Sequence, residues 1–407
     1  MHDYGLTPGL WDIIGGTYGL AFVNRNAVAA AIEAPVCLAP ATVREALRAM
    51  ASTHPVLRMS LSHPTDPRLC RQVIAGVDDA VARAILVHDD DAPEAPDALQ
   101  ARMTHHVAAV ADRLDVAAGV TWGVAHLTAG ATHHLVFVFN HVVCDLLSAS
   151  QFIRTFVCST ESACERPAPP DTYLEHLRIA DVDLDADDGA ATSWWHARPW
   201  AHIGEVPGIE PGRTGSSGLT TWVDVLDEGI TVTEHRLIHA IDQGLRDVTS
   251  LTTTRIDSAV HGRGSRVTRT AGGWISHAVP YLAAPGEGAP AVESTRRRAG
   301  TWPSAFASVR ARPDLPMDVQ LRAHAFVNFF GSLDPRRWSH DGYRLSAVQP
   351  DFEPAGRASL TPLRLRVNSV NRRWVATWTV SESFTDRHGV AKEVAERALK
   401  NLASMSA

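Results

Sequence analysis

A histidine and an aspartate stand four residues apart in the stretch "FNHVVCDLLSAS" (139–150), directly after an apolar run. Histidine is the side chain best suited to accept a proton near neutral pH, so His141 is a candidate general base. Asp145 either caps the helix that follows or takes part in the chemistry. With 20 histidines in the chain, about one such spacing is expected by chance, so the pair alone does not establish an enzyme.

The surrounding elements place this pair between a buried strand and a helix. Two runs, "VTWGVAHL" (120–127) and "HHLVFVFN" (133–140), are separated by a Gly-containing turn, which predicts paired strands. The second run is apolar from Leu135 to Phe139, as in a strand buried on both faces. A helix is predicted from about 146 to 158, and the N–H groups at its start could face a developing negative charge. This context favours chemistry over capping alone.

Hydrophobic spacing predicts further elements along the chain. The predicted segments are a helix and then a strand in 39–61, a linker at 164–172, helices at 172–180 and 231–248, strands at 252–260 and 274–282, a mobile loop at 283–300, two strands in 363–381 and a closing helix in 386–402.

The composition limits the classes of protein to consider. At 407 residues the chain exceeds one ordinary hydrophobic core, so two domains are expected. A formal net charge of −7 argues against nucleic acid or a general anionic membrane as a partner. The sequence has neither an apolar stretch of about 18 residues nor a signal-peptide start, so we expect a soluble, cytoplasmic protein.

The cysteines form no recognisable framework. There are five, all in the first half, and an odd set without a CxxC pair predicts reduced thiols rather than disulfides or a zinc site. Cys144 adjoins His141, but the side chain at that place is expected to pack inward rather than act as a nucleophile.

Other polar clusters have ordinary structural interpretations. His133 and His134 fit the start of a strand. His235 and His239 have a metal-ligand spacing on a helix but lack a third ligand nearby, so we expect no metal site. The three arginines at 296–298 are either a solvated loop or an anchor for an acidic or phosphate-bearing partner.

Five segments, in order, resemble the condensation and epimerization domains of nonribosomal peptide synthetases, in the superfamily of chloramphenicol acetyltransferase-like acyltransferases. The family motif HHxxxDGxS stands here as Asn140 to Ser148. "STHPVLRMSL" (52–61) is similar to the family's "RHxxLRTxF", and "TYLEHL" with "SWWHARP" resembles the segment leading to its "YW". "HGRGSRVTRTAGGWISHAVPYL" (261–282) looks like the epimerization-type "EGHGRE…RTVGWFTxxYPVxL", and "FVNFFGSLD" (326–334) is similar to "FNYLGQFD".

Two departures fall within the central motif. Asn140 replaces the first histidine, and Leu146 replaces the glycine after the aspartate. A glycine lets the backbone approach a substrate closely, so a leucine there could narrow the channel or shift the loop.

The resemblance also implies roles around the third segment. The two glutamates of "EGHGRE" fall on Ala259 and Gly264, so the carboxylate that epimerization domains use opposite the histidine is missing, which argues against two-base epimerization. The family's arginine survives as Arg263, and the resemblance implies that it pairs with Asp145. We therefore interpret Asp145 as structural, because a buried carboxylate needs such a partner.

The implied fold is α/β: two chloramphenicol acetyltransferase-like lobes, about 1–168 and 173–407, forming a V-shaped pseudo-dimer with a central cleft or tunnel. His141 is the expected catalytic residue, in mid-channel. Backbone N–H groups near Leu146 and Leu147, with Ser148, are candidates for stabilising an oxyanion. Candidates for lining the site are Asn140, Leu146, Leu147, Ser148, Trp274, His277 and Asn328, although packing is the expected role of Trp274.

The leading hypothesis is a free-standing acyltransferase of natural-product biosynthesis that acts as a monomer. It would form an amide or ester from an acyl thioester on phosphopantetheine, carried by an acyl or peptidyl carrier protein in trans or by coenzyme A, and a small amine or hydroxyl acceptor. We expect no permanently bound cofactor. Two alternatives stay open: a non-catalytic docking module that recruits other enzymes, and a cyclization or other tailoring enzyme that uses the same histidine as a base.

Overall fold

A computed structural model of the chain describes most of its residues. The described residues are 3–7, 10, 14, 20–66, 69–160, 170–185, 193–195, 197–198, 200, 203, 205–207, 209–211, 219–226, 229–283, 289–301, 323–332, 342–352, 361–370, 373–381, 384–386 and 389–405.

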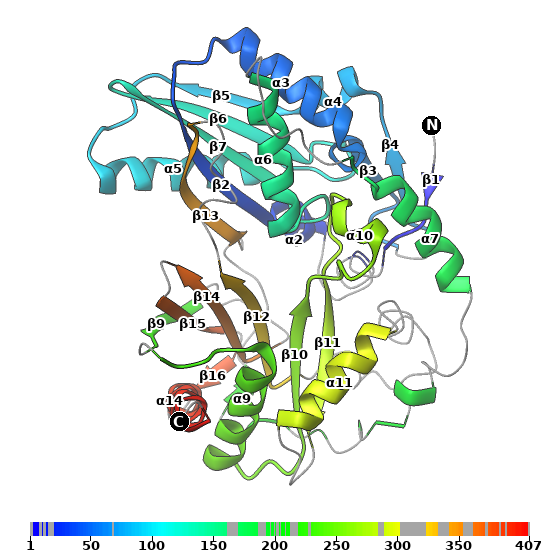
Figure 1. Ribbon diagram of the computed structural model, residues 1–407, viewed down its shortest axis with the longest axis vertical. Coiled ribbons are helices and arrows are strands. Elements are labelled where there is room, and N and C mark those ends of the chain that lie inside the picture. Colours follow the sequence, from blue (N-terminus) through cyan, green and yellow to red (C-terminus); the bar gives the residue numbers. More distant parts are fainter. Residues whose placement is uncertain are drawn as a thin grey trace. The chain divides into compact units, whose positions relative to one another are not determined.

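The chain divides into two compact units (Figure 1). Unit 1 comprises Met1–Asp183, Arg263–Ser276 and Asp334–Pro354, and unit 2 comprises Leu184–Gly262, His277–Leu333 and Ala355–Ala407. Two segments from the second half of the sequence thus pack with the first half. The division into lobes 1–168 and 173–407 remains a prediction of domain organisation; the compact units differ from it by these two exchanged segments.

Unit 1 consists of a five-stranded sheet, a three-stranded sheet and helices. Its elements are β1 (Asp3–Tyr4), α2 (Leu20–Arg25), β2 (Ala27–Ala34), α3 (Pro40–Thr53), the 3-10 helix η1 (Pro55–Arg58), β3 (Met59–Ser62), β4 (Arg71–Ile74), α4 (Val77–Arg83), β5 (Ile85–Asp89), α5 (Pro96–Ala111), β6 (Trp122–Ala129), β7 (Thr132–Asn140), α6 (Leu146–Thr160), α7 (Tyr173–Asp185), α10 (Arg266–Thr270) and β13 (Arg344–Phe352).

The five-stranded sheet has the order β13-β2-β7-β6-β5 and is covered on both faces. On one face Val136 and Val138 of β7 join a core cluster that includes Val107 of α5. On the other, Phe137 and Phe139 of β7 make edge-to-face contacts with aromatic side chains of α6. This double burial explains the uninterrupted apolar run of β7 and confirms that prediction.

Unit 2 is built on a six-stranded sheet of order β11-β10-β12-β14-β15-β9 and a two-stranded sheet. Its elements are β8 (Ile209–Pro211), β9 (Leu219–Val225), α9 (Glu234–Val248), β10 (Thr254–Val260), β11 (His277–Ala283), α11 (Ala289–Thr301), β12 (Ala325–Ser332), β14 (Leu363–Val370), β15 (Arg373–Ser381), β16 (Phe384–Asp386) and α14 (Val390–Ser404). Side chains of α9, α11 and α14 share one core cluster with one face of this sheet.

Most of the predicted elements are confirmed, and one prediction is wrong. The predicted loop at 283–300 contains the helix α11, Ala289–Thr301. Val292 and Thr295 are buried against the rest of unit 2, so tertiary packing stabilises a helix whose own sequence has a weak apolar stripe. Residues 284–288 lie outside the described part of the chain.

The cysteines also differ from expectation. Cys37, Cys70 and Cys144 are free, whereas Cys158 is disulfide-bonded, so the prediction of five reduced thiols is wrong. An odd number of cysteines excludes complete pairing but not a single bond. The cytoplasmic location remains a prediction.

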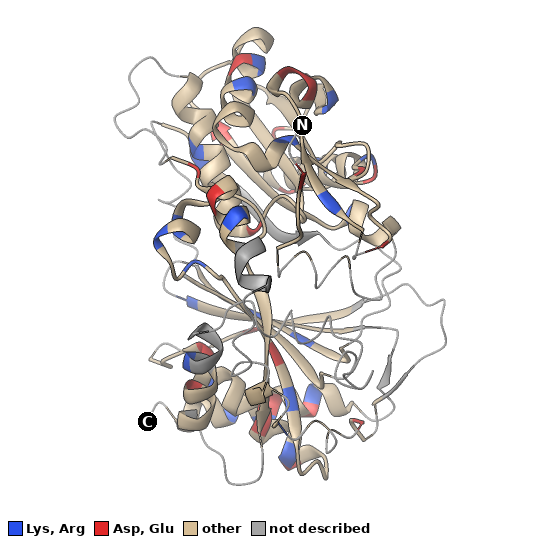
Figure 2. Cartoon of the chain, turned by 90° about the vertical axis from the view of Figure 1, so that its right-hand side faces the viewer, with Lys and Arg blue, Asp and Glu red and all other residues tan. Residues whose placement is uncertain are grey.

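No helix among the described residues is long and apolar enough to cross a membrane. In Figure 2, Lys and Arg positions and Asp and Glu positions both occur along the described helices of each unit. This agrees with the modest net charge of −7.

Candidate functional site

The connection between β7 and α6 carries the residues that the sequence singles out. β7 ends at Asn140 and α6 begins at Leu146, so residues 141–145 form a short loop. Asp145 caps the helix, because its Oδ1 accepts a hydrogen bond from the backbone N–H of Ser148 at 2.9 Å. The capping interpretation therefore holds, and it does not exclude a second role for this carboxylate.

Asn140 holds the start of the loop. Its side chain is fully buried, and its Nδ2 donates to the carbonyl oxygens of Val23 and Asn24, both at 2.9 Å. Its Oδ1 accepts from the backbone N–H of Val142 at 2.9 Å. All of these partners are backbone groups, so Asn140 ties the loop to the end of α2 rather than lining a site that solvent can reach.

Arg263 brings a distant segment to the same loop. Its Nη1 donates to Asp145 Oδ2 at 2.5 Å, and its Nη2 donates to Ser148 Oγ at 2.7 Å. The same Nη2 lies 3.2 and 3.3 Å from the carbonyl oxygens of Ala271 and Gly273. Arg263 and Asp145, 118 residues apart in sequence, are both buried, so the guanidinium is the counter-charge that the buried carboxylate requires.

The charge state of Asp145 follows from these contacts. Burial by itself would raise the pKa of Asp145, but the Arg263 guanidinium and the hydrogen bonds from Ser148 outweigh it and hold that pKa below its usual value. Asp145 is therefore a carboxylate at neutral pH, a poor proton acceptor whose role is to hold Arg263 and the helix start together.

Ser148 belongs to the same cluster as Asp145 and Arg263. It is fully buried, its N–H is used by Asp145, and its Oγ accepts from Arg263. The hydroxyl proton has two acceptors within 2.8 Å, Asp145 Oδ1 and the carbonyl of Gly273. A role of Ser148 at an oxyanion stays a prediction, and the structure already engages its N–H and its hydroxyl in these contacts.

His141 is half-buried, and Trp274 lies against its ring. The ring centroids are 4.0 Å apart and the planes are inclined by 34°. The backbone N–H of His141 donates to the carbonyl of Asn26 at 2.8 Å, which fixes the main chain from which the imidazole projects. Trp274 therefore has a packing role, as expected from the sequence, and it packs against His141, the candidate base.

Cys144 is unsuited to act as a nucleophile. Its side chain is fully buried, and burial, reinforced by the neighbouring Asp145 charge, raises the pKa of the Cys144 thiol well above its usual value. The thiol donates to the carbonyl oxygen of Asp145 at 3.1 Å. At neutral pH it stays protonated and inert.

Leu146 and Leu147 form the first turn of α6. Leu146 is buried and Leu147 is half-buried. The first N–H groups of a helix have no acceptor within that helix, so their backbone can serve an anion near His141.

The remaining predicted lining residues belong to unit 2. His277 is the first residue of β11, and Asn328 lies in β12, paired in register with Ala259 of β10; both side chains are half-buried. Their participation at the site stays a prediction.

Sequence reasoning missed Asp171, which supports the site from the side of α7. Its buried Oδ2 lies 2.5 Å from His54 Nδ1, and His54 Nε2 lies 2.7 Å from Thr155 Oγ1. Its Oδ1 accepts from the backbone N–H of Gly272 at 3.2 Å. The described end of the predicted linker, 170–172, has no regular secondary structure, as predicted, but Asp171 makes these buried contacts; residues 164–169 lie outside the described part of the chain. An Asp-Thr pair directly before a helix is a capping signal that could have revealed this.

His176 is a second imidazole near Arg263. Burial, with a smaller contribution from repulsion by Arg263, lowers the pKa of His176 from 6.5 to about 4. It is therefore neutral at physiological pH. Its place in the stretch "TYLEHL" made it visible only as part of the family resemblance.

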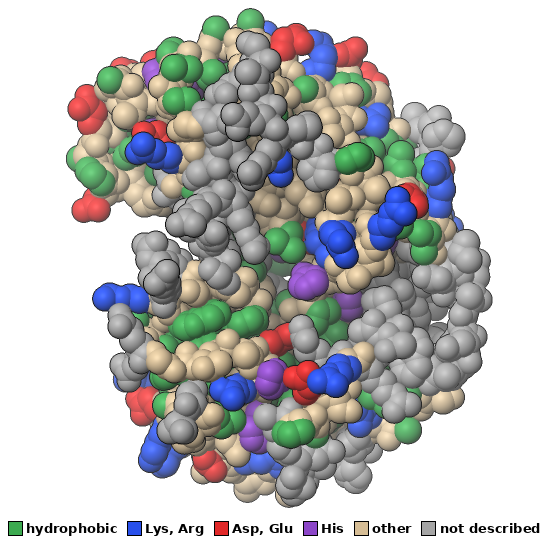
Figure 3. All heavy atoms as spheres, viewed as in Figure 1, with side chains coloured by type: hydrophobic (Ala, Val, Ile, Leu, Met, Phe, Trp, Pro, Cys, Tyr) green, Lys and Arg blue, Asp and Glu red, His purple; other side chains and the backbone are tan. Residues whose placement is uncertain are grey.

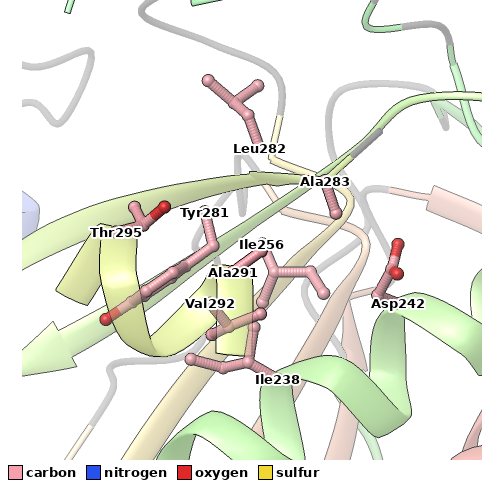
Figure 4. A pocket seen from close by; sticks show the side chains of 9 residues that line it. All are labelled: Ile238, Asp242, Ile256, Tyr281, Leu282, Ala283, Ala291, Val292 and Thr295. Carbon is pink, nitrogen blue, oxygen red and sulfur yellow. The ribbon is translucent and has the colours of Figure 1, made fainter. Parts of the chain in front are cut away.

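A pocket within unit 2 shows a different character. It contains about 310 Å³ of space, part of it open to solvent, and apolar side chains such as Ile238, Ile256 and Val292 point into it (Figure 4). Its carboxylate, Asp242, is already held by Arg246 Nε at 2.8 Å. This pocket has no arrangement of groups for acid–base chemistry comparable to that beside His141.

Histidine exposure alone does not identify a site. On the face drawn in Figure 3, several histidine side chains reach the surface. Within the described part of the chain, no group of three or more His, Cys, Asp and Glu side chains could hold a metal ion. What sets His141 apart is its surroundings: a helix start, a locked carboxylate and a stacked indole.

Comparisons with known proteins bear on the fold. The sequence matches no protein-family model and no curated protein. Among solved structures, the epimerization domain from the third module of tyrocidine synthetase B is 15% identical, with 100% of this chain and 98% of that chain covered and a TM-score of 0.76. The SgcC5 protein from Streptomyces globisporus, in complex with (R)-(-)-1-(2-naphthyl)-1,2-ethanediol and sucrose, is 14% identical over 99% and 98% of the two chains, with a TM-score of 0.74.

A third neighbour is a variant of the starter condensation domain of rhizomide synthetase in complex with C8-CoA. It is 15% identical, covers 99% of this chain and 95% of its own, and has a TM-score of 0.71. The chain has the condensation-domain fold.

This fold confirms the α/β class and the architecture that the five sequence segments imply. Identities of 14–15% show the fold alone, so in a condensation-domain fold the chemistry must still be argued from the residues of the site. The arrangement of the two units and the cleft expected between them stay predictions.

Proposed function

We propose that this protein is an acyltransferase that forms an amide or an ester from a pantetheine-linked acyl thioester and an amine or hydroxyl acceptor. One observation carries the proposal: His141 is left as the proton-accepting group of its loop. Asp145 is held as a carboxylate by Arg263, and Cys144 is buried and protonated. An imidazole can accept a proton from the attacking amine or hydroxyl, which is the step that activation of the acceptor needs.

In the proposed reaction the acceptor nitrogen or oxygen attacks the carbonyl carbon of the thioester. His141 orients the acceptor or takes its proton. The tetrahedral intermediate then collapses, the C–S bond breaks, and the thiol leaves with a proton. The N–H groups of Leu146 and Leu147 at the start of α6 are the proposed donors to the oxyanion.

Few side chains are required for this reaction. Holding two reactants in a productive geometry supplies much of the acceleration of a bimolecular transfer. A site with one base and a helix N-terminus is therefore sufficient in principle, even though the double histidine of the family motif is reduced to His141.

The substrate classes have support from the neighbours' ligands. A condensation domain of the same fold binds C8-CoA, a coenzyme A thioester, and SgcC5 was crystallised with a diol. We take these as guides to a thioester donor, on a carrier protein or coenzyme A, and to a hydroxyl or amine acceptor. Two-base epimerization is not part of the proposal, because Ala259 and Gly264 stand where that reaction needs a glutamate.

The test is intact-mass analysis of acylated carrier proteins, and of acyl-coenzyme A, incubated with the protein and an acceptor. We expect loss of the acyl group and a new amide or ester product. His141→Ala should lower the transfer rate about 10²–10⁴-fold, the range typical of a lost general base. A matched variant, His133→Ala at the start of β7, should stay within about twofold of the original rate.

Three outcomes would contradict the proposal. Unchanged masses with every candidate thioester would argue for a docking module without catalysis. A His141→Ala variant that transfers as fast as the original protein would move the chemistry to another group. A product that is cyclic, with no new intermolecular bond, would favour a cyclization enzyme instead.

A further inference from the structure

Trp274 lies in a backbone segment that is anchored on its N-terminal side by side chains from two helices. The N–H of Gly272 donates to Asp171 Oδ1 at 3.2 Å, next to the start of α7. The carbonyl of Gly273 accepts from Ser148 Oγ of α6 at 2.8 Å. The two residues before Trp274 are therefore held from opposite directions.

The C-terminal side is anchored as well. The N–H of Ile275 points to Asp145 Oδ2 at 3.4 Å, the oxygen that also binds Arg263. Asp145 and Asp171 are both buried, and together they bracket the indole by its flanking peptide groups. These two N–H contacts, at 3.2 and 3.4 Å, are longer than usual for a carboxylate, but with the 2.8 Å bond from Ser148 Oγ they attach the main chain on both sides of Trp274.

Two glycines let this segment lie directly against the helices. A Cβ atom on Gly272 would come within 2.8 Å of Phe152 of α6, and one on Gly273 within 2.7 Å of the Tyr173 ring of α7. Gly273 also has a φ of +103°, which other residues rarely adopt. The close approach brings the indole over the imidazole of His141, with ring centroids 4.0 Å apart.

A general base must also be held in orientation. In a Ser-His-Asp arrangement a carboxylate orients the imidazole, but here the oxygens of Asp145 are directed to Ser148 and Arg263. The χ2 torsion of a histidine is broad, so its ring turns easily unless something packs on it.

We infer that Trp274 is a positioning residue for His141: its anchored indole holds the imidazole in one orientation for proton transfer. The inference rests on the proposed acyl transfer, and it assigns an orienting role to the indole, whose plane is inclined by 34° to that of the imidazole. Asp171, through Gly272, contributes to the same positioning from the side of α7.

Steady-state kinetics and crystal structures of two variants of the full chain test this. Trp274→Leu should lower kcat about 10–100-fold with KM changed less than about threefold, because a misplaced base slows the chemical step rather than binding. Trp274→Phe keeps a flat ring and should restore kcat to within about threefold. In crystals, the His141 imidazole should occupy one orientation in the original protein and in Trp274→Phe, and more than one in Trp274→Leu.

The matched control is Trp222→Leu, which removes a half-buried indole of unit 2 stacked on Trp378. It should leave both readouts unchanged. An ordered imidazole and a normal kcat in Trp274→Leu would overturn the inference while leaving the acyl transfer intact, and so would a Phe variant as slow as the Leu variant with its imidazole still ordered. If the original protein transfers no acyl group, the proposed function fails, and the imidazole orientation in the crystals still decides the role of Trp274.

Discussion

The two units each contain a buried carboxylate that is held by a guanidinium, and the two pairs differ in sequence separation. In unit 2, Asp242 and Arg246 are four residues apart on α9, with Nε 2.8 Å from Oδ1. In unit 1, Asp145 and Arg263 are 118 residues apart and join the start of α6 to the segment before α10.

The difference shows how a structural pair becomes part of a site. The pair in α9 ties one helix to its neighbours, with Thr254 and the carbonyl of Ala283 as further partners. The pair in unit 1 links a loop, a helix and a distant glycine-containing segment, and His141 and Trp274 meet at that junction. A long-range pair can thus set the geometry of a candidate active site, whereas this local pair connects one helix to the strands beside it.

Removing the guanidinium of the long-range pair should have the largest effect. Arg263→Ala leaves the Asp145 carboxylate buried without its counter-charge, so the free energy of unfolding should fall by about 3–5 kcal/mol. Acyl transfer should fall at least about 100-fold, because the segment that carries Trp274 loses its anchor. Urea unfolding and the intact-mass assay measure the two effects.

The local pair supplies the control for this prediction. Arg246→Ala should lower the free energy of unfolding by about 1–3 kcal/mol, since Arg246 is partly exposed and Asp242 keeps its bond from Thr254. Transfer should stay within about twofold. Equal losses of activity in Arg263→Ala and Arg246→Ala would show that the long-range pair has no special role at the site.

The histidine beside Arg263 should make unit 1 sensitive to acid. Because the pKa of His176 is about 4 in the folded chain and 6.5 without its environment, the unfolded state binds an extra proton between these values. The stability that depends on neutral His176 is fully present above about pH 6.5 and is lost as the pH falls toward 4. The free energy of unfolding should fall by about 1–3 kcal/mol over this range. Chemical denaturation across this range should show a smaller loss in His176→Gln than in the original protein.

The matched substitution in unit 2 is His239→Gln. Burial also lowers the pKa of His239, so His239→Gln should lose less stability in acid than the original protein. The difference should be smaller than that for His176→Gln. An acid dependence in His176→Gln identical to that of the original protein would contradict the assigned environment of His176.

The smallest effect is expected next to Asp145 itself. Cys144→Ala removes a buried thiol that stays protonated, so transfer should remain within about twofold and the free energy of unfolding should fall by about 1 kcal/mol. Rates of the purified variant in the mass assay provide the check. A loss as large as that of His141→Ala would assign the nucleophile to Cys144.

The local hydrophobic pattern was sufficient to predict the strands and the helix that flank the loop of His141. The apolar run of β7, the Gly-containing turn before it and the periodicity of α6 predict the junction at which His141 stands. It was insufficient for α11, whose few apolar residues give a weak stripe and whose helix depends on packing in unit 2.

The residues of the site also divide into those that the sequence predicts and those that it does not. His141, Asp145 and Arg263 were candidates from their types and from the family motif, and the structure places Asp145 and Arg263 in contact. Ser148 was assigned to an oxyanion site, whereas in the structure its Oγ accepts a hydrogen bond from Arg263. Asp171 was assigned to a linker, because a pattern of prolines carries no information about a partner 100 residues away.

The sequence by itself determined the elements of this protein, the place of one histidine between a strand and a helix, and the missing glutamates that set it apart from epimerization domains. Only the tertiary structure showed that Asp145 and Arg263, whose pairing the family resemblance implied, are in contact and that Trp274 lies against the imidazole. The reason is physical: periodicity reports on neighbours within a few residues, whereas the charge and orientation of a buried side chain depend on groups that packing brings from distant parts of the chain.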